Sequence, residues 1–568
     1  MHIAPPAASP DRPPLGTALA VAERRPRLFL LLLCLLLYLP GFFTLPATDR
    51  DEARFAQATR QMVETGDHVR IRFGEEERNK KPAGIHWLQS ASVQALEAAG
   101  LGSRDDIWAY RVPSFAGAVL AVLATFHWGR ALVGRRAAFL GAAMLASSLV
   151  LVIEAHIAKT DAALLAVVTA AMGLFGAAYL RPGAFSAKQA AAFWLVLGAS
   201  VLLKGPVGPM VPLLAGITLA VADKGAPWLK ALRPLWGVPL MLLAGAPWFV
   251  AIGIATEGRF FAEAVGGDML AKIGSGEEKH WGPPGYYLLT FPIAAFPGAW
   301  IVLLALPSGW RDRRTVAAAR FLLAWAVPSW LVFEAVQTKL PHYTLPLFPA
   351  LMLLGAAWAM DPLRRIPPRR WWRAAAVAAL VLVAVGFGLA ALAAPWFTLR
   401  GVLWPWGAFL APPLALLLLW AVLCAARRGD HGRAALLGAL LAALPYAAAL
   451  EGVAPRLQPL WIAPRLEALL AERAPGLPAS DFGITGYAEP SAVFAVGTGT
   501  NLLRTGGDAA RFLAGAPGRV VAVGNRAEAD FRAEAAALRI APVEIGTVTG
   551  LNYTRGRWIT LILYRLDP

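Results

Sequence analysis

The amino-acid sequence predicts an α-helical protein that crosses the membrane many times and carries a small α/β domain outside it. Hydrophobic residues make up 57% of the 568 residues and charged residues only 16%, whereas soluble proteins carry about a quarter charged residues. The hydrophobic residues gather in runs of about twenty, the length of a helix that crosses a bilayer. After the last run, short strand-like segments and turns replace this pattern.

The hydrophobic runs predict about 13 transmembrane helices within residues 27–454. The segment before them, 1–26, is rich in Pro, Ala and Arg and is expected to be a disordered cytoplasmic N-terminus. The first run lacks a cleavage site of small residues, so we interpret it as a retained helix and not as a signal peptide. The expected spans are 28–46, 110–128, 137–153, 161–180, 190–203, 207–222, 235–255, 286–306, 320–337, 343–360, 374–394, 402–425 and 434–452.

The charges between the runs predict the topology, because cytoplasmic loops are enriched in Lys and Arg. Every second connector is basic, and these connectors contain Arg130, Arg135 and Arg136, then Arg181 and Lys188, then Lys224, Lys230 and Arg233, then Arg311, Arg313 and Arg314, then Arg364, Arg365, Arg369, Arg370 and Arg373, and finally Arg427, Arg428 and Arg433. The loops 47–109 and 256–285 and the C-terminal domain are then extracytoplasmic.

The same placement explains the formal net charge of +17. Basic residues that cluster in short connectors indicate membrane topology, so no nucleic-acid partner is expected and membrane lipids are the expected surroundings. We expect a multi-pass protein of a bacterial inner membrane whose active site faces the periplasm.

The region 455–568 is expected to fold as a periplasmic α/β domain. Its Gly497-Thr-Gly499 and Gly506-Gly507 segments are interpreted as turns, because neither forms a G-x-G-x-x-G motif between a strand and a helix. The expected strands are Phe482–Thr485, Ala492–Val496, Val520–Val523 and Trp558–Tyr564, and the expected helix is Ala527–Leu538. No catalytic residues are expected there.

The most polar extracytoplasmic stretch is Thr48–Trp87. Thr48 and Asp51 have the spacing of a capping box, which predicts a helix that runs to about Glu64 and ends at Gly66. Two interpretations of the acidic start remain open. Asp51 and its neighbour Glu52 either complement the positive helix N-terminus or present a catalytic or binding carboxylate to a cavity at the membrane surface.

Several cations are expected on the same membrane face. Lys80 and Lys81 precede Pro82, and Lys204 and Lys339 end or follow hydrophobic runs. Such residues either snorkel to anionic lipid or hold the phosphate of a ligand.

Two further residues on this face are candidates for a metal site. Asp161 is either a helix cap or a cavity residue, and His280 is an isolated histidine. A carboxylate and a histidine are both common metal ligands. A divalent metal is therefore possible, with Asp161 and His280 as candidate ligands, and no other cofactor is expected.

Taken in order, five motifs resemble one family: Asp51-Glu-Ala-Arg-Phe-Ala, Lys80-Lys81-Pro82, Lys159-Thr-Asp161, Lys204-Gly-Pro-Val and Lys339-Leu-Pro-His-Tyr343. The chain resembles the aminoarabinose lipid A transferases over roughly residues 28–360. These are GT-C glycosyltransferases related to the protein O-mannosyltransferases. The resemblance implies a GT-C transmembrane domain, a polyprenyl-phosphate-linked sugar donor, with 4-amino-4-deoxy-L-arabinose as the sugar, and an acceptor such as lipid A or another envelope glycolipid.

The resemblance also assigns roles to residues. Asp51, with Glu52 beside it, is the expected catalytic carboxylate, and a hydroxyl acceptor would need it as general base. The resemblance places the family's arginine on Arg54, its phosphate-binding lysine on Lys81 and its lid tyrosine on Tyr343. From their position on the same membrane face, Lys204 and Lys339 are further expected donor-phosphate residues, and the other expected cavity residues are Asp161, His342 and His280. Lys81 and Arg54 would stabilise the leaving phosphate.

The chain departs from the family in two places. Relatives commonly have Glu-Lys-Pro where this chain has Lys80-Lys81-Pro82, so a carboxylate proposed to hold a metal is missing. The loop Gly-Gly-Asp268-Met-Leu-Ala-Lys272 also lacks the Glu-His pattern of the lipid A enzymes. The sugar and the acceptor are therefore left open.

Two other classes of protein compete with the transferase. A flippase or transporter of a polyprenyl-linked sugar would show broken, charged segments near mid-membrane in two matching halves, and no such internal repeat is found. A receptor-like scaffold with a binding domain at its C-terminus would leave the cations of the outer face without a role.

Overall fold

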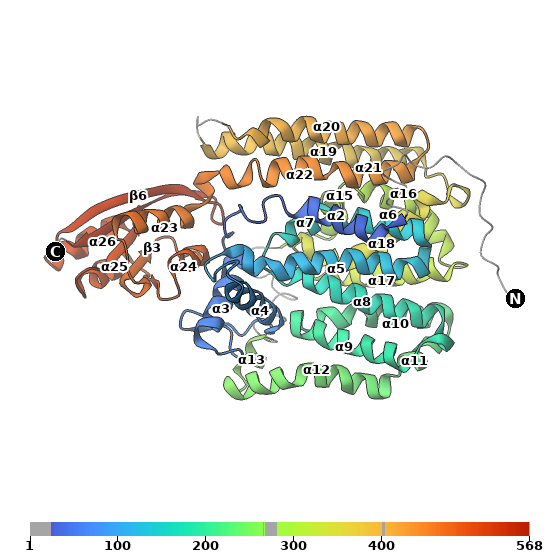
Figure 1. Ribbon diagram of the computed structural model, residues 1–568, viewed down its shortest axis with the longest axis horizontal. Coiled ribbons are helices and arrows are strands. Elements are labelled where there is room, and N and C mark those ends of the chain that lie inside the picture. Colours follow the sequence, from blue (N-terminus) through green and yellow to red (C-terminus); the bar gives the residue numbers. More distant parts are fainter. Residues whose placement is uncertain (1–23, 265, 267–280, 400–403, 567–568) are drawn as a thin grey trace.

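The computed structural model describes residues 24–264, 266, 281–399 and 404–566. A bundle of long helices forms one part of the molecule and a five-stranded sheet with its helices forms the other (Figure 1). The helices of the bundle are α2 (Pro26–Tyr38), α5 (Ile107–Val133), α6 (Arg135–Ala146), α7 (Leu149–Ala155), α8 (Asp161–Leu180), α9 (Ala187–Lys204), α10 (Val207–Asp223), α11 (Pro227–Leu232), α12 (Pro234–Ala255), α15 (Tyr286–Ala294), α16 (Ala299–Asp312), α17 (Ala317–Ala335), α18 (Phe348–Met360), α19 (Arg370–Leu399), α20 (Trp406–Arg427), α21 (His431–Leu441) and α22 (Ala443–Leu450).

The prediction of a multi-pass helical membrane protein is confirmed. Among the described residues, nine helices are long and apolar enough to cross a membrane, and ten if the bent pair α6–α7 forms one span. Two shorter apolar helices, α2 and α10, and the divided pair α15–α16 cover the remaining expected spans. The count of thirteen therefore stays a prediction.

The bend between α6 and α7 has a local cause. The hydroxyl groups of Ser147 and Ser148 donate to the carbonyl oxygens of Met144 and Leu145, at 3.2 and 2.7 Å. Such bonds compete with the helical ladder and bend helices. The two helix axes differ by 61°, and α7 then leads into the polar segment before α8.

Three short elements lie at the end of the bundle that faces the sheet: α3 (Asp51–Thr65), α4 (Gly84–Ala98) and α13 (Arg259–Phe261) (Figure 1). A two-stranded hairpin, β1 (Arg72–Phe73) and β2 (Glu76–Glu77), connects α3 to α4. The described N-terminal part of α2 points to the opposite end of the bundle. The polar loops and the C-terminal domain thus share one end, as the topology prediction requires.

The start of α3 corrects one prediction. The helix begins at Asp51 after Arg50, which has a φ of 65°, and no side chain caps it. Thr48 does not cap the helix, because it lies two residues before the N-cap residue Arg50; its hydroxyl and its backbone N–H both donate to the Glu52 carboxylate at 2.8 Å. The predicted capping box is therefore wrong, whereas the predicted end at the left-handed Gly66 is confirmed.

The C-terminal domain is built on a sheet with the strand order β4-β3-β5-β7-β6. Strands β3, β4 and β5 are parallel, and β7 is antiparallel to both β5 and β6. The strands are β3 (Phe482–Thr485), β4 (Asn501–Leu502), β5 (Val520–Gly524), β6 (Pro542–Asn552) and β7 (Arg557–Leu566), and the helices are α23 (Ile462–Arg473), α24 (Pro490–Val496), α25 (Gly506–Ala514) and α26 (Glu528–Ala537).

Two predictions for this domain are wrong. The segment Ala492–Val496 belongs to helix α24 and not to a strand, because Pro490 in the first turn favours helix initiation. Gly506-Gly507 opens α25 and is not a turn; a Cβ at Gly506 would lie 2.1 Å from the Ala527 carbonyl oxygen, so this position needs glycine for close packing. The other predicted strands and the predicted helix are confirmed.

The C-terminal domain is docked onto the start of α3. The carboxylate of Asp49 accepts hydrogen bonds from Tyr487, at 3.2 Å, and from Ser491, and its backbone N–H donates to Tyr553 at 2.5 Å. Burial raises the pKa of Asp49 to about 6, although the hydroxyl donors oppose this shift. Asp49 therefore connects the sheet domain to the segment immediately before α3.

Candidate functional site

A cavity of about 740 Å³ lies where α3 and the segment before α4 meet the ends of α8, α9 and the 3-10 helix η4 (Pro341–Leu347). Its lining has two kinds of surface. Six basic side chains and two carboxylates gather in one part, and they are Arg54, Arg78, Lys80, Lys81, Lys159, Lys204, Asp51 and Asp161. Apolar and aromatic side chains make up much of the remaining lining, with Met210, Phe249, Phe260 and Phe333 from α10, α12, α13 and α17, and Phe55 and Leu164 from α3 and α8.

Asp51 is placed at this cavity by the first turn of α3. Burial alone would raise its pKa, but the positive charges of Lys81, Lys159, Arg78 and Arg54 act on it and hold the pKa below its ordinary value. The carboxylate is therefore ionised at neutral pH. The negative charge of Asp51 thus faces a predominantly basic surface.

Glu52 lies on a different side of α3 and does not line the cavity. Its carboxylate forms a two-point ion pair with Arg111 of α5, at 2.7 and 3.1 Å, and both side chains are buried. It also accepts the backbone N–H of Ala158 at 3.0 Å. Glu52 thus joins α3, α5 and the segment before Asp161. This position separates it from Asp51, with which the sequence analysis had grouped it as catalytic.

Lys81 is held against an aromatic ring. Its ammonium lies 5.0 Å from the centre of the Phe55 ring, and the Arg78 guanidinium lies 4.6 Å from it. The imidazole of His86 stacks on the same ring at 5.3 Å. Burial is the largest cause that lowers the pKa of Lys81 to about 8, and the neighbouring Lys204 and Arg78 lower it further against the opposing charge of Asp51.

Asp161 is not the cap of α8, because Thr160 occupies the N-cap position and Asp161 is the first residue of the helix. Lys204 forms an ion pair with its Oδ1, and the ammonium of Lys159 lies 3.8 Å from its Oδ2. Lys159 also pairs with Glu154 at 3.2 Å. The ammonium of Lys204 lies 5.1 Å from the centre of the Tyr343 ring. Asp161 and Glu154 therefore fix two lysines at the cavity.

The two carboxylates of these pairs also belong to a group of possible metal ligands. Ligand atoms of Glu154, Asp161 and His342 lie within 4.8 Å of one another. However, Lys159 pairs with both carboxylates and Lys204 pairs with Asp161, so two ammonium groups already compensate these charges. A metal would have to displace both lysines. This donor set does not fit a resident divalent cation.

The structure brings most of the predicted site residues together. The cavity is lined by Asp51, Arg54, Lys81, Asp161, Lys204, His342 and Tyr343. Lys339 is buried, but its ammonium donates to the carbonyl oxygen of Val336 and it does not line the cavity. His280 lies outside the described residues, so the predicted metal pair of Asp161 and His280 is not examined by the structure.

Three cavity residues were not among the predicted site residues, whereas Lys80 was predicted as a cation of this face. Arg78 lies three residues before Lys81, and Lys159 precedes Asp161 in one of the five motifs. The hydroxyl of Thr160 is buried at the cavity and has no hydrogen-bond partner in the described part of the chain. Closeness in sequence to a predicted residue was the only signal for Arg78, Lys159 and Thr160.

Comparisons with known proteins give consistent similarities. The model of the dolichyl-phosphate-mannose-protein mannosyltransferase family matches residues 92–259. The undecaprenyl phosphate-α-4-amino-4-deoxy-L-arabinose arabinosyl transferase of Aeromonas salmonicida is 31% identical over 337 residues, which is 58% of this chain and 59% of that protein. The transferase of the same name from Yersinia pestis is 30% identical over 368 residues, 61% of this chain and 64% of that protein. The chain thus spans about three fifths of the length of these curated relatives.

Solved structures show the fold. The crystal structure of ArnT from Cupriavidus metallidurans in the apo state superposes on this chain with a TM-score of 0.73 and 20% sequence identity. The superposition covers 96% of this chain and 98% of the ArnT chain. The same protein bound to undecaprenyl phosphate gives a TM-score of 0.72 and 19% identity, with the same coverage. The fold therefore extends over the helical bundle and the C-terminal sheet together.

Proposed function

We propose that this chain, an ArnT-like membrane protein with the GT-C fold, is a glycosyltransferase that moves a sugar from a polyprenyl-phosphate donor to an extracytoplasmic acceptor. The observation that carries the proposal is the composition of the cavity lining, which combines six basic side chains with many apolar and aromatic ones. A polyprenyl-phosphate sugar combines the same two features, because an anionic phosphate joins its sugar to a long apolar tail.

The basic part of the cavity suits the donor phosphate. Lys81, Arg54 and Lys204 supply positive charge, and the ring of Tyr343 lines the same cavity 5.1 Å from the Lys204 ammonium. Charge-assisted hydrogen bonds to phosphate are about twice as strong as neutral ones. The apolar part, with its phenylalanines, then holds the first isoprene units of the tail.

The transfer reaction assigns a role to Asp51. The bond between the anomeric carbon and the phosphate oxygen breaks, and its electron pair leaves with the polyprenyl phosphate. The acceptor oxygen forms the new bond to the anomeric carbon. If the acceptor is a hydroxyl group, its proton moves to the ionised Asp51 carboxylate, which acts as general base. Lys81 and Arg54 stabilise the growing negative charge on the leaving phosphate.

The finer assignments follow the named relatives. The sugar is 4-amino-4-deoxy-L-arabinose and the carrier is undecaprenyl phosphate, as the relatives' names state for them. The acceptor is lipid A or another envelope glycolipid. The protein lies in the inner membrane with the cavity on the periplasmic side, because the basic connectors belong on the cytoplasmic side.

Reconstitution with a labelled donor tests the proposal and separates it from a flippase. Purified protein in liposomes receives radiolabelled polyprenyl-phosphate sugar and a lipid A acceptor. Label that appears in the acceptor and depends on the protein supports the transferase. Label that crosses the bilayer but stays on the carrier, with every acceptor tried, would overturn the proposal in favour of transport.

A further inference from the structure

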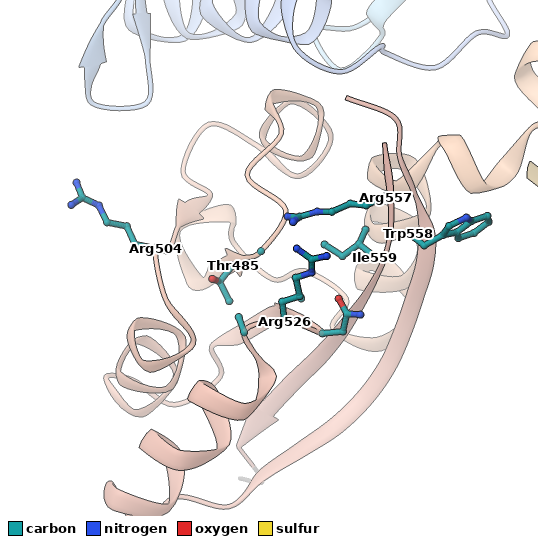
Figure 2. A pocket seen from close by; sticks show the side chains of 10 residues that line it. Thr485, Arg504, Arg526, Arg557, Trp558 and Ile559 are labelled. Atoms are coloured by element: carbon teal, nitrogen blue, oxygen red, sulfur yellow. The ribbon is translucent and has the colours of Figure 1, made fainter. Parts of the chain in front are cut away.

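A second cavity, of about 140 Å³, lies in the C-terminal domain (Figure 2). It is lined by residues at the carboxyl ends of β3, β4 and β5 and at the start of β7. The chain passes from β3 to β4 on one side of β3, whereas β5 lies on its other side. The strands that follow β3 therefore lie on its two opposite sides, which is called a topological switch point. In sheets with parallel strands, ligands bind outside the carboxyl ends of the strands at such a point.

The lining of this cavity is basic. Arg504, Arg526 and Arg557 line it, and no acidic side chain does. Figure 2 shows the guanidinium groups of Arg526 and Arg557 pointing into the same space, while Arg504 extends outward. In the described part of the chain, no carboxylate lies within 4.0 Å of the guanidinium groups of Arg526 and Arg557. Guanidinium groups that share a cavity without a counter-charge favour an anion between them.

The acidic side chains nearby in sequence are engaged elsewhere. Glu528 accepts hydrogen bonds from Arg532 at 2.7 Å and from the Tyr564 hydroxyl at 3.2 Å. Asp530 accepts the backbone N–H of Gly507 at 2.8 Å. These contacts keep both carboxylates away from Arg526, so the cavity retains its positive charge.

A second observation concerns Thr485 at the end of β3. This residue is 1% exposed and lines the cavity, and its hydroxyl has no hydrogen-bond partner among the described residues. A buried hydroxyl without a hydrogen-bond partner destabilises the folded protein. A bound anion would give it one. The adjoining Gly486, with a φ of 83°, and Gly524 keep this end of the cavity free of side chains.

The end of the sheet that lines this cavity lies close to the membrane domain. Tyr487, two residues after β3, contacts Asp49, and Tyr553 in the turn between β6 and β7 contacts the same residue. We propose that this cavity binds a phosphate group, either of a free phosphate or pyrophosphate or of a lipid headgroup. The volume of about 140 Å³ is large enough for a phosphate or a pyrophosphate and too small for a sugar-lipid. The site is separate from the 740 Å³ cavity and does not depend on the proposed transfer reaction.

Protection from chemical modification tests this site in the full-length protein. Purified protein in detergent is treated with phenylglyoxal, with and without inorganic pyrophosphate, and each arginine is followed by mass spectrometry. Arg526 and Arg557 should react at least fivefold more slowly with pyrophosphate, while Arg473 of α23, which is exposed and pairs only with its neighbour Glu472, should be unchanged. Residue-by-residue readout excludes a contribution from the other cavity.

Two further experiments identify the source of the bound phosphate and the contribution of the Thr485 hydroxyl to its binding. In nanodiscs of phosphatidylcholine with phosphatidic acid, protection without added pyrophosphate indicates a lipid phosphate, whereas protection by pyrophosphate alone indicates a soluble one. Thr485→Val removes the hydroxyl at nearly constant shape and should raise the pyrophosphate concentration for half protection at least threefold. Reaction rates of Arg526 and Arg557 that do not change with pyrophosphate or with phosphatidic acid would overturn the proposal.

Discussion

Glu52 and Arg111 form a buried ion pair that joins the first turn of α3 to the transmembrane helix α5. Nε of Arg111 lies 2.7 Å from Oε1 of Glu52, and the two side chains are 0% and 1% exposed. Arg111 also donates to the carbonyl oxygens of Leu45 and Pro46 at 2.7 and 3.0 Å. The pair therefore fixes the direction of α3, and with it the position of Asp51 at the cavity.

Removing one charge of this pair should destabilise the protein strongly. Glu52→Gln keeps the shape but leaves the Arg111 guanidinium buried without a counter-charge, which costs about 3–5 kcal/mol. The thermal unfolding midpoint and the monodisperse fraction of the purified variant measure the effect. Glu97→Gln is the control, because Glu97 pairs with Arg104 in a partly exposed position and such pairs contribute about 1 kcal/mol or less. Similar losses in the two variants would contradict the role given to Glu52.

Donor use should weaken at alkaline pH. The pKa of Lys81 is about 8, so its ammonium population falls as the pH rises through this value. If Lys81 binds the donor phosphate, kcat/KM for the donor should fall by up to about tenfold per pH unit above this value. Lys81→Arg keeps its charge over this range and should remove the alkaline fall, even if its absolute rate is lower. The same fall in both proteins would show that another group titrates.

The docking of the C-terminal domain should depend on pH through Asp49. Its folded-state pKa of about 6 lies above the ordinary value of 3.8, so the folded state holds this proton more tightly than the unfolded state. The associated stability is present at low pH and is lost as the pH rises from 4 through 6, by about 3 kcal/mol at 1.4 kcal/mol per unit. Asp49→Asn cannot ionise, so its stability relative to the parent should increase over this interval. A constant difference between the two unfolding curves from pH 4 to 7 would argue against this assignment.

The topology gives a further prediction. Single cysteines introduced at Lys80 and Lys204 should react with a membrane-impermeant maleimide added from the periplasmic side, and cysteines at Arg369 and Arg428 should react only after the membrane is opened. The native Cys34 and Cys424 are replaced by Ala first. If cysteines at positions 80 and 369 were labelled from the same side of the membrane, the predicted alternation of cytoplasmic and periplasmic loops would be wrong.

The sequence predicted which motifs form the site better than it predicted the separate roles of the residues within them. Asp51 and Glu52 are adjacent in sequence, but successive residues of an α-helix point about 100° apart, so only one of them can face the cavity. The partner of Glu52 is Arg111, 59 residues away at the start of a hydrophobic run. Nothing in the local pattern of that run distinguishes a buried partner from an interfacial arginine.

The errors in secondary structure have similar physical causes. The alternation in Ala492–Val496 fits a strand, but Pro490 and the extended Glu489 begin a helix there. Thr48 has the spacing of a cap, but its hydroxyl donates to the neighbouring Glu52 carboxylate. Hydrogen bonds to a charged acceptor are stronger than those between neutral groups. Long apolar helices and basic connectors were predictable because they depend on composition over many residues, whereas caps and short strands depend on single contacts.

The most direct test of the proposed reaction is the transfer rate of Asp51→Asn. Asparagine preserves the shape of the side chain and removes the charge, and a residue that only complements the helix N-terminus would lose little by this change. If Asp51 is the general base, turnover should fall by about 10²–10⁴-fold with the fold preserved. Asp105→Asn is the control, because Asp105 is exposed outside the cavity and pairs with Arg60.

The measurement is the rate of sugar transfer against donor concentration for purified, monodisperse Asp51→Asn, Lys81→Ala and Asp105→Asn proteins. The account predicts a loss of turnover for the first, a rise in the donor concentration needed by the second, since a phosphate partner is lost, and parent-like kinetics for the third. Parent-like kinetics of both Asp51→Asn and Lys81→Ala would contradict the proposed site.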